Sequence, residues 1–241
     1  IIFSDVMDDN LETIASGIAA PDPIQLNNVY KILKKTKLIQ ESFVSKHIEK
    51  IINNPSILPL KKSNKVFYNV KSYIAANNDT CVKQAKKTLE KKVSFINSSS
   101  LRLKGEASKM GKKLAKWFIK NAQKNKCFTV VGGETTVTLD LCTAGKGGRS
   151  QELALSYALY MKQNFNQKRD WIILSAGTDG RDGPTDAAGA IISSHQKLDI
   201  NQAKKSLYNH DSYNFLLAKN MLIKTGGTNT NLGDIVILTM G

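Results

Sequence analysis

Hydrophobic positions follow two different spacings along the chain. Short apolar or β-branched runs are typical of strands, and apolar positions three and four residues apart are typical of one helix face. On this basis strands are predicted at residues 1–6, 66–75, 93–96, 127–131, 135–141, 171–174 and 234–239. Helices are predicted from residue 26 onward, at 43–52, after an Asn-rich N-cap at 77–79, at 105–123, at 149–164, around residue 202 and at 211–219. This alternation predicts an α/β fold with an at least partly parallel sheet.

Two prolines mark a boundary in this pattern. Pro55 and Pro59 lie in a polar, Lys-rich stretch, which indicates a division of the chain near residue 60. A chain of 241 residues has room for one or two domains, each with its own core. It opens with Ile1, inside a strand-like run and without an initiator Met, so we expect its natural start to lie upstream.

The formal net charge is +15, from 35 basic and 20 acidic residues. A basic module that binds nucleic acid is compatible with this balance. The lysines are scattered over predicted helix faces with few aromatic residues between them, which indicates a solvated surface instead. Attraction of small anionic substrates fits either interpretation.

Membrane and secretory signals are not found in the sequence. No apolar run approaches the ~18–20 residues that a membrane span needs. The first residues show no basic region followed by a cleavage site, so the given sequence is not expected to contain a signal peptide. The three Cys form no CxxC pair, which favours a reducing compartment. We expect a cytoplasmic protein, with a mitochondrial location as the alternative.

The loop that follows the predicted strand at 171–174 concentrates acidic and small residues. Asp179, Asp182 and Asp186 lie among four glycines there. Ligands of α/β proteins bind at the carboxyl ends of strands, so these carboxylates are candidates for metal-phosphate chemistry. The alternative is a tight acidic turn, since Asp and Gly are turn formers. The spacing does not fit an EF-hand, because Ala190 stands where the bidentate Glu belongs.

A glycine loop precedes the helix predicted at 149–164. Gly147 and Gly148 place small residues at a helix N-terminus, which is an anion-binding feature. The loop is not a Walker motif, because Asp140 replaces the first glycine. Arg149 opposes the helix dipole, and bidentate binding of a phosphate or carboxylate would offset that cost. The alternative is a structural pair with Glu134 or Glu152.

Two further strand ends carry polar residues. Glu134 and Thr135 follow two glycines after the strand at 127–131, and Ser4 and Asp5 follow the first strand. These groups can contact a metal, a ribose or a substrate hydroxyl, or simply form turns. The dispersed histidines His47, His195 and His210 show no metal-ligand spacing and are interpreted as structural or solvated. No GxSxG elbow supports acyl transfer.

Several segments, taken together, resemble one family, the class II glycerate kinases, whose C-terminal module is called the MOFRL domain. The segments are SDVMDDNLETIASGIAAPDP at 4–23, GGETTVTL at 132–139, GKGGRSQELAL at 145–155, SAGTDGRDGPTDAAGAI at 175–191 and TGGTNTN at 225–231. The resemblance implies a partial Rossmann-like N-terminal domain at 1–62 and a C-terminal α/β domain with a mixed sheet at 63–241. The family's active-site Lys and glycine-rich loop would lie upstream of Ile1.

The resemblance also implies an activity, the transfer of the ATP γ-phosphoryl group to the 2-hydroxyl of D-glycerate. Asp5, Arg149 and Asp179 would be catalytic, with Asp5 and Asp179 as candidate Mg²⁺ ligands. Substrate or phosphate would contact Ser4, Glu134, Thr135, Gly147, Gly148, Asn229 and Asn231. ATP and Mg²⁺ are the implied cofactors and D-glycerate the implied substrate, without nucleic-acid or membrane partners and with homo-oligomerisation left open. Another small hydroxy acid and the basic binding module are the alternatives.

Overall fold

The computed structural model describes residues 1–91, 94–96, 101–122, 126–139 and 145–241. Contacts between residues divide the chain into two compact units, one of Ile1–Asp8 with Ile74–Gly241 and one of Asp9–Tyr73. The predicted α/β class with a mixed sheet is confirmed. Among the described residues, no helix has the length and hydrophobicity to span a membrane.

A six-stranded sheet forms the centre of the larger unit. Its spatial order is β3-β4-β8-β5-β6-β7. The strands are β3 (Ser94–Phe95), β4 (Cys127–Gly133), β5 (Trp171–Gly177), β6 (Gly189–Ser193), β7 (Leu222–Ile223) and β8 (Asp234–Met240). Within this sheet only β3 and β4 pair in parallel, and the other neighbours are antiparallel. A separate parallel pair joins β1 (Ile2–Phe3) to β2 (Ile74–Ala76).

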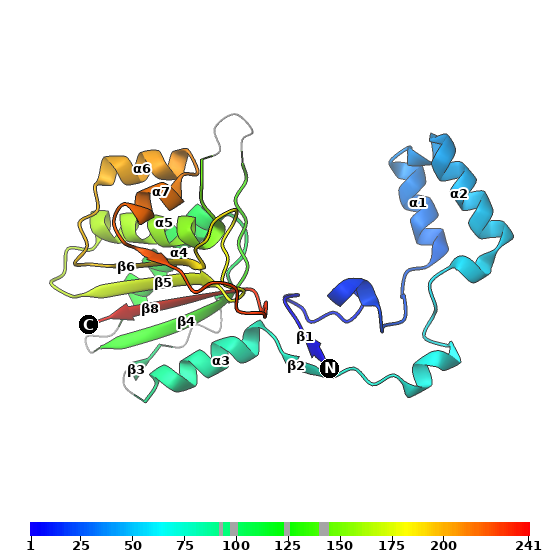
Figure 1. Ribbon diagram of the computed structural model, residues 1–241, viewed down its shortest axis with the longest axis horizontal. Helices are drawn as coiled ribbons and strands as arrows, with labels where there is room; N and C mark the ends of the chain where they lie inside the picture. The colour runs from blue at the N-terminus through cyan, green and yellow to red at the C-terminus, as the bar shows by residue number, and fades with distance from the viewer. Residues whose placement is uncertain (92–93, 97–100, 123–125, 140–144) are drawn as a thin grey trace. The chain divides into compact units, whose positions relative to one another are not determined.

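Helices cover both faces of this sheet (Figure 1). One face carries α4 (Ala107–Asn121) and α5 (Arg149–Asn164), with α6 (Ile200–Tyr208) and α7 (Ser212–Leu217) packed outside α5. The opposite side carries α3 (Asn78–Leu89), which contacts β4 and β8. Asn77 begins α3 as predicted, through a reciprocal capping box with Thr80.

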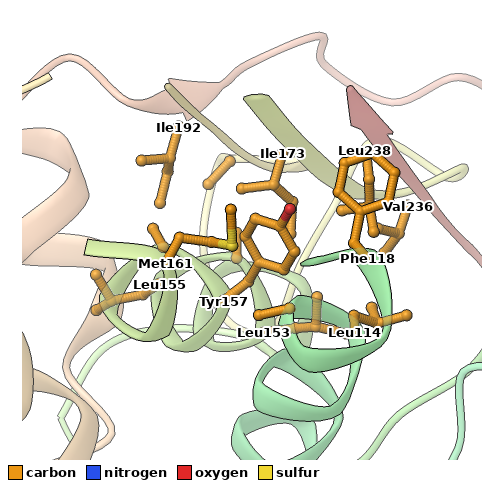
Figure 2. Close-up of a cluster of buried hydrophobic side chains, with 14 of the residues drawn as sticks. Leu114, Phe118, Leu153, Leu155, Tyr157, Met161, Ile173, Ile192, Val236 and Leu238 are labelled. Atoms are coloured by element: carbon orange, nitrogen blue, oxygen red, sulfur yellow. The ribbon is translucent and has the colours of Figure 1, made fainter. Parts of the chain in front are cut away.

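The main core lies between the sheet and the α4–α5 layer. Figure 2 shows apolar side chains of α4 and α5 directed toward those of β5, β6 and β8. The two helices approach closely at Gly111, where an added Cβ would lie 2.4 Å from the Leu153 carbonyl oxygen. Helix α5 is consequently buried on nearly all sides, including its polar residues Gln151 and Glu152.

The register of β8 determines what lies at one edge of the sheet. Because β8 runs antiparallel to both β4 and β5, its first residue, Asp234, pairs with the last residues of those strands, Gly133 and Gly177. Glu134 and Asp179, which follow β4 and β5, therefore lie at the same edge as Asp234. An antiparallel strand, β8, lies between the two strands that these residues follow.

The smaller unit is helical. It contains α1 (Leu26–Lys35) and α2 (Ser42–Asn53) with four short 3-10 helices, at Ile14–Gly17, Leu38–Gln40, Pro55–Ile57 and Lys65–Asn69. Residues 9–73 include no strand, so β1 is the one strand among residues 1–62. Ile14 is the one buried hydrophobic side chain among the described residues of this unit.

Two predicted strands are wrong. Residues 66–75 form the 3-10 helix at Lys65–Asn69 and extended chain, and only their end enters β2. Residues 135–139 form no strand but a single bridge, Glu106 to Thr136, while 140 and 141 lie outside the described residues. Their β-branched residues suited a strand, but the amides bond instead to the segment before α4: Thr136 N–H donates to the Gly105 carbonyl, and Thr138 N–H to Glu106 Oε1.

The divisions between the two units fall after residues 8 and 73. They differ from a single boundary near 62 because β1 pairs with β2 and because Ser4 N–H donates to the Ala76 carbonyl. The assignment of residues 1–62 and 63–241 to two domains stays a prediction.

Candidate functional site

A cavity of about 620 Å³ lies at the sheet edge where Asp234 begins β8. Its lining comes from residues within 134–139, 145–152 and 179–184, together with His210. Acidic groups outnumber arginines there, with Glu134, Glu152, Asp179 and Asp182 against Arg149 and Arg181. The cavity is therefore acidic although the chain as a whole is strongly basic.

Arg149, in the first turn of α5, is held by carboxylates on two sides. Its Nε and Nη2 donate to Asp234 Oδ2 and Oδ1 at 2.7 and 3.0 Å, and its Nη1 donates to Glu134 Oε1. The predicted alternative of a pair with Glu134 is thus present, whereas Glu152 bonds elsewhere. Three of the five guanidinium N–H groups are used in these bonds to described residues, which leaves two for a ligand.

Asp234 is the most deeply buried partner of Arg149. Its side chain is 2% exposed, against 40% for Glu134. Burial raises the pKa of Asp234 to about 6, although the hydrogen bonds from Arg149 oppose this shift. A buried carboxylate bonded bidentately to Arg149 fixes the direction of the guanidinium at the cavity wall.

Asp182 caps the N-terminus of α5. Ser150 N–H and Gln151 N–H donate to its Oδ1 and Oδ2 at 3.0 and 2.8 Å. The anion-binding position expected at this helix N-terminus is therefore filled by a carboxylate of the chain itself. Gly148 permits this approach, since an added Cβ would lie 2.3 Å from the Asp182 carboxyl carbon. Burial raises the pKa of Asp182, while the two backbone hydrogen bonds lower it.

Glu152 and His210 form a second buried pair beside the cavity. His210 Nδ1 lies 2.9 Å from Glu152 Oε2, and the side chains are 19% and 3% exposed. Burial raises the pKa of Glu152, and the hydrogen bond with His210 opposes it. The interpretation of His210 as structural or solvated is incomplete, because the residue also lines the cavity.

Asp179 lies at the turn that follows β5. Its Oδ1 accepts from Arg181 N–H at 3.0 Å, and its carbonyl accepts from Thr228 N–H at 3.1 Å. The Thr228 hydroxyl also donates to the Thr178 carbonyl. The loop at 225–231 is therefore fixed on the turn that carries Asp179.

Six of the predicted site residues line this one cavity: Glu134, Thr135, Gly147, Gly148, Arg149 and Asp179. Thr135 is 1% exposed, and its hydroxyl has no partner among the described residues. That orphaned oxygen is available to a ligand in the cavity.

The other four predicted residues do not line the cavity. Ser4 is buried, and its hydroxyl bonds to the backbone of Val6. Asp5 accepts a hydrogen bond from Asn231 Nδ2 at 3.0 Å, so these two residues meet each other. Asn229 is exposed, with a left-handed backbone at φ 59°.

The described residues contain no group of three or more His, Cys, Asp or Glu side chains arranged to hold a metal ion. Asp182 and Asp234 are occupied by backbone amides and by Arg149. Asp179 and Glu134 are the carboxylates best placed to offer oxygen to a hard cation, and Mg²⁺ commonly takes only one or two carboxylates beside substrate phosphates.

Sequence reasoning missed Asp234, the capping role of Asp182 and the Glu152–His210 pair. Each depends on contacts between distant segments, such as the separation of 85 residues between Arg149 and Asp234. A chemical signal was available for Glu152 alone. It lies within a predicted helix, and a buried Glu requires a hydrogen-bond or charge partner.

Two family models match the chain. The model of the MOFRL family matches residues 127–234, and the domain of unknown function DUF4147 matches residues 1–53. The first match includes all six predicted residues that line the cavity. The second includes Ser4 and Asp5.

The chain is also similar to named proteins over nearly its whole length. It is 32% identical to a D-glycerate 2-kinase of Thermotoga maritima and 33% identical to a glycerate 2-kinase of Pyrococcus horikoshii, in each case over 98% of this chain. The match covers 55% and 54% of those relatives, so the chain spans about half their length. A crystal structure of a Thermotoga maritima glycerate kinase superposes with a TM-score of 0.78 at 31% identity, covering 99% of this chain and 56% of that one.

Proposed function

We propose that the natural full-length protein, whose residues 1–241 here belong to the family of glycerate kinases that contain the DUF4147 and MOFRL regions, transfers the γ-phosphoryl group of ATP to the 2-hydroxyl of D-glycerate. We expect residues 1–241 alone to be inactive or nearly so, because they span about half the length of the relatives. The observation that carries the proposal is the fixed guanidinium of Arg149 at an acidic cavity. Phosphoryl transfer asks a protein mainly to position its reactants and to balance their charge. These residues are suited to both tasks.

In this proposal Arg149 binds the transferring phosphoryl group or the glycerate carboxylate with its two remaining N–H groups. Asp234 and Glu134 hold the guanidinium in place. A preorganised donor needs no reorientation as charge develops, and for this reason it stabilises the transition state more than water does. The orphaned hydroxyl of Thr135 would donate to, or accept from, the same ligand.

The acidic lining is consistent with a cation that accompanies ATP. Asp179 would contribute a carboxylate oxygen to Mg²⁺, with Glu134 as a further candidate in the cavity. Asp5, the other candidate from the sequence, does not line this cavity and accepts a hydrogen bond from Asn231 instead. The ion, when bound, neutralises charge on the β- and γ-phosphates. Without it, a polyphosphate would meet more carboxylates than arginines in the cavity.

Replacement of Arg149 tests the proposal. We expect Arg149→Ala to lower kcat/KM by at least ~10²-fold, the scale for removal of one preorganised charge donor. The measurement is coupled ADP release by the natural full-length protein with D-glycerate, L-glycerate and hydroxypyruvate, with and without Mg²⁺. Product analysis distinguishes 2- from 3-phosphorylation.

Arg169→Ala is the matched control, since Arg169 does not line the cavity and its Nε donates to the Gly241 carbonyl. We expect it to keep the wild-type rate. A near-wild-type rate for Arg149→Ala would remove Arg149 from the site. Turnover with a different hydroxy acid, and none with D-glycerate, would show that the enzyme has another substrate. Salt-dependent binding of nucleic acid without turnover would favour the basic binding module.

A further inference from the structure

His210 reaches the cavity through an unusual backbone position. It lies between α6 and α7 with φ 50°, a left-handed conformation that non-glycine residues seldom adopt. Its N–H donates to the Leu207 carbonyl at 3.3 Å, at the end of α6. A strained residue of this kind persists only where the surrounding contacts hold it.

Those contacts come from the glycine loop on the other side of the turn. Gly145 N–H donates to the Asn209 carbonyl at 2.8 Å, and Lys146 N–H donates to Asp211 Oδ1 at 3.0 Å. The bond from Tyr213 N–H to the Lys146 carbonyl, at 2.9 Å, completes the attachment. The loop that leads into α5 therefore fixes the residues on both sides of His210.

Glu152 then fixes the ring itself. Its Oε2 lies 2.9 Å from His210 Nδ1 and is almost fully buried. With an ionised Glu152, Nδ1 carries the proton and donates, and the other ring nitrogen, Nε2, is left as an acceptor. The same division of roles between a buried carboxylate and a His makes the imidazole a base in hydrolytic enzymes.

We propose that His210 is the general base of the phosphoryl transfer and that Glu152 is the residue that positions it. This inference rests on the proposed function. The proton of the attacking hydroxyl passes to His210 Nε2 as the new oxygen–phosphorus bond forms. The bond between the γ-phosphorus and the bridging oxygen breaks, and ADP leaves with that electron pair.

The surroundings of the pair contain other charged groups that influence its titration. Those that line the cavity with it are Glu134, Arg149, Asp179, Arg181 and Asp182. Outside the lining, Glu106 at the start of α4 interacts with Glu152, and Lys146 and Asp211 flank His210 on the glycine loop and the turn. Acids outnumber bases among these groups, so the formal charge around the pair is negative.

His210→Asn tests the role with a residue that suits the backbone conformation of this turn. Asn is among the residues that tolerate the left-handed conformation, but its amide cannot accept a proton at neutral pH. In the natural full-length protein we expect kcat to fall by about 10²-fold or more, the usual contribution of a general base. The loss of rate on the acidic side of the kcat profile should also disappear, with the KM for ATP nearly unchanged.

Two further variants complete the test. Glu152→Gln keeps the size of the side chain but removes the charge. We therefore expect a lower kcat and a shift in the pH at which kcat decreases on the acidic side. His195→Asn is the matched control, because His195 pairs with Asp170 at 3.1 Å on the surface and is 75% exposed. It should leave the profile unchanged.

The outcomes separate the two proposals. An active wild-type enzyme whose pH profile is the same in His210→Asn overturns the role of His210 and leaves the kinase function standing. A loss of rate on the alkaline side that His210→Asn removes also overturns it, since His210 would then bind an anion in its charged form. A wild-type protein that releases no ADP with any hydroxy acid overturns both.

Discussion

Asp234 and Arg149 meet across 85 residues of sequence. The sequence indicates Arg149, because a cation in the first turn of a helix opposes the helix dipole. It also indicates Glu134 and Asp179, because both follow strands. Asp234 begins a strand after a turn-rich loop and looks like an ordinary turn residue. Only the register of β8 between β4 and β5 shows that it supports the site.

The titration of Asp234 makes stability depend on pH. Its pKa is about 6 in the folded protein, raised from 3.8 by burial. Between roughly pH 4 and 6 the folded state keeps a proton that the unfolded chain has released. The contribution of Asp234 to the free energy of unfolding should therefore be largest below pH 4 and should decrease as the pH rises through 6, by at most ~1.4 kcal/mol per pH unit for one proton.

Urea unfolding from pH 4 to 7 measures this effect. Asp234→Asn removes the titrating group, so we expect a shallower pH dependence than in the wild type. Burial also raises the pKa of Glu152 and of Asp182. Because both residues remain in the variant, the pH dependence should become shallower but should not disappear. Asp170→Asn, at a surface carboxylate, should keep the wild-type slope. Equal pH dependence of the unfolding free energy in the wild type and Asp234→Asn would contradict the raised pKa of Asp234.

At the level of elements, α5 combines the core and the site. Ten consecutive residues from Ser150 to Leu159 are buried, and the N-terminus of the helix is closed by Asp182. Periodicity predicts the helix and its limits correctly, since apolar spacing and the glycine loop are local signals. The residue that accepts hydrogen bonds from its N-terminal amides, Asp182, is distant in sequence. No local signal therefore indicates that Asp182 occupies the predicted ligand site.

Gly148→Ala tests how closely Asp182 and α5 must approach. The new methyl group would overlap the Asp182 carboxyl group, so Asp182 would have to move away from the helix amides. We expect a loss of about 1–3 kcal/mol in the free energy of unfolding, the range for an overpacked position. Gly227→Ala is the matched control, because no heavy atom lies within 4 Å of its added Cβ. Similar unfolding midpoints for the two variants would contradict this account.

The strand expected at 135–141 shows the limit of propensity. Thr135, Thr136 and Val137 favour strands. A segment with high β propensity can join a sheet, however, only where a strand has an unpaired edge. In the larger unit β3 and β8 already pair with the two edges of β4. The segment bonds instead to the chain before α4, and it places Thr135 in the cavity lining.

For the whole molecule, the two units differ in what they bury. The larger unit has a continuous core, whereas the described part of the unit at 9–73 buries only Ile14 among its hydrophobic side chains. Between α1 and α2 lies an apolar groove of about 500 Å³. Spacing predicts both helices, but it does not report how little surface they bury.

Amide hydrogen exchange of the 241-residue chain should reveal this difference. We expect α1 and α2 to exchange at least about 10³-fold faster than α4 and β8, because weakly packed segments open at almost no cost while a core opens at a large part of the global free energy. Mass spectrometry of peptic fragments measures both groups in one sample. Equal protection of α2 and α4 would show that the helical unit has a stability of its own.

The central place of β8 has a consequence for biosynthesis. The ribosome adds Asp234 85 residues after Arg149, which takes roughly 4–17 s at about 5–20 residues per second. In the later part of that interval, once β5 has also been added, β4 and β5 lack the strand that pairs with both of them. Their facing edges are then open to another nascent chain or to a chaperone, and the carboxylate that holds Arg149 arrives with the strand that closes the gap.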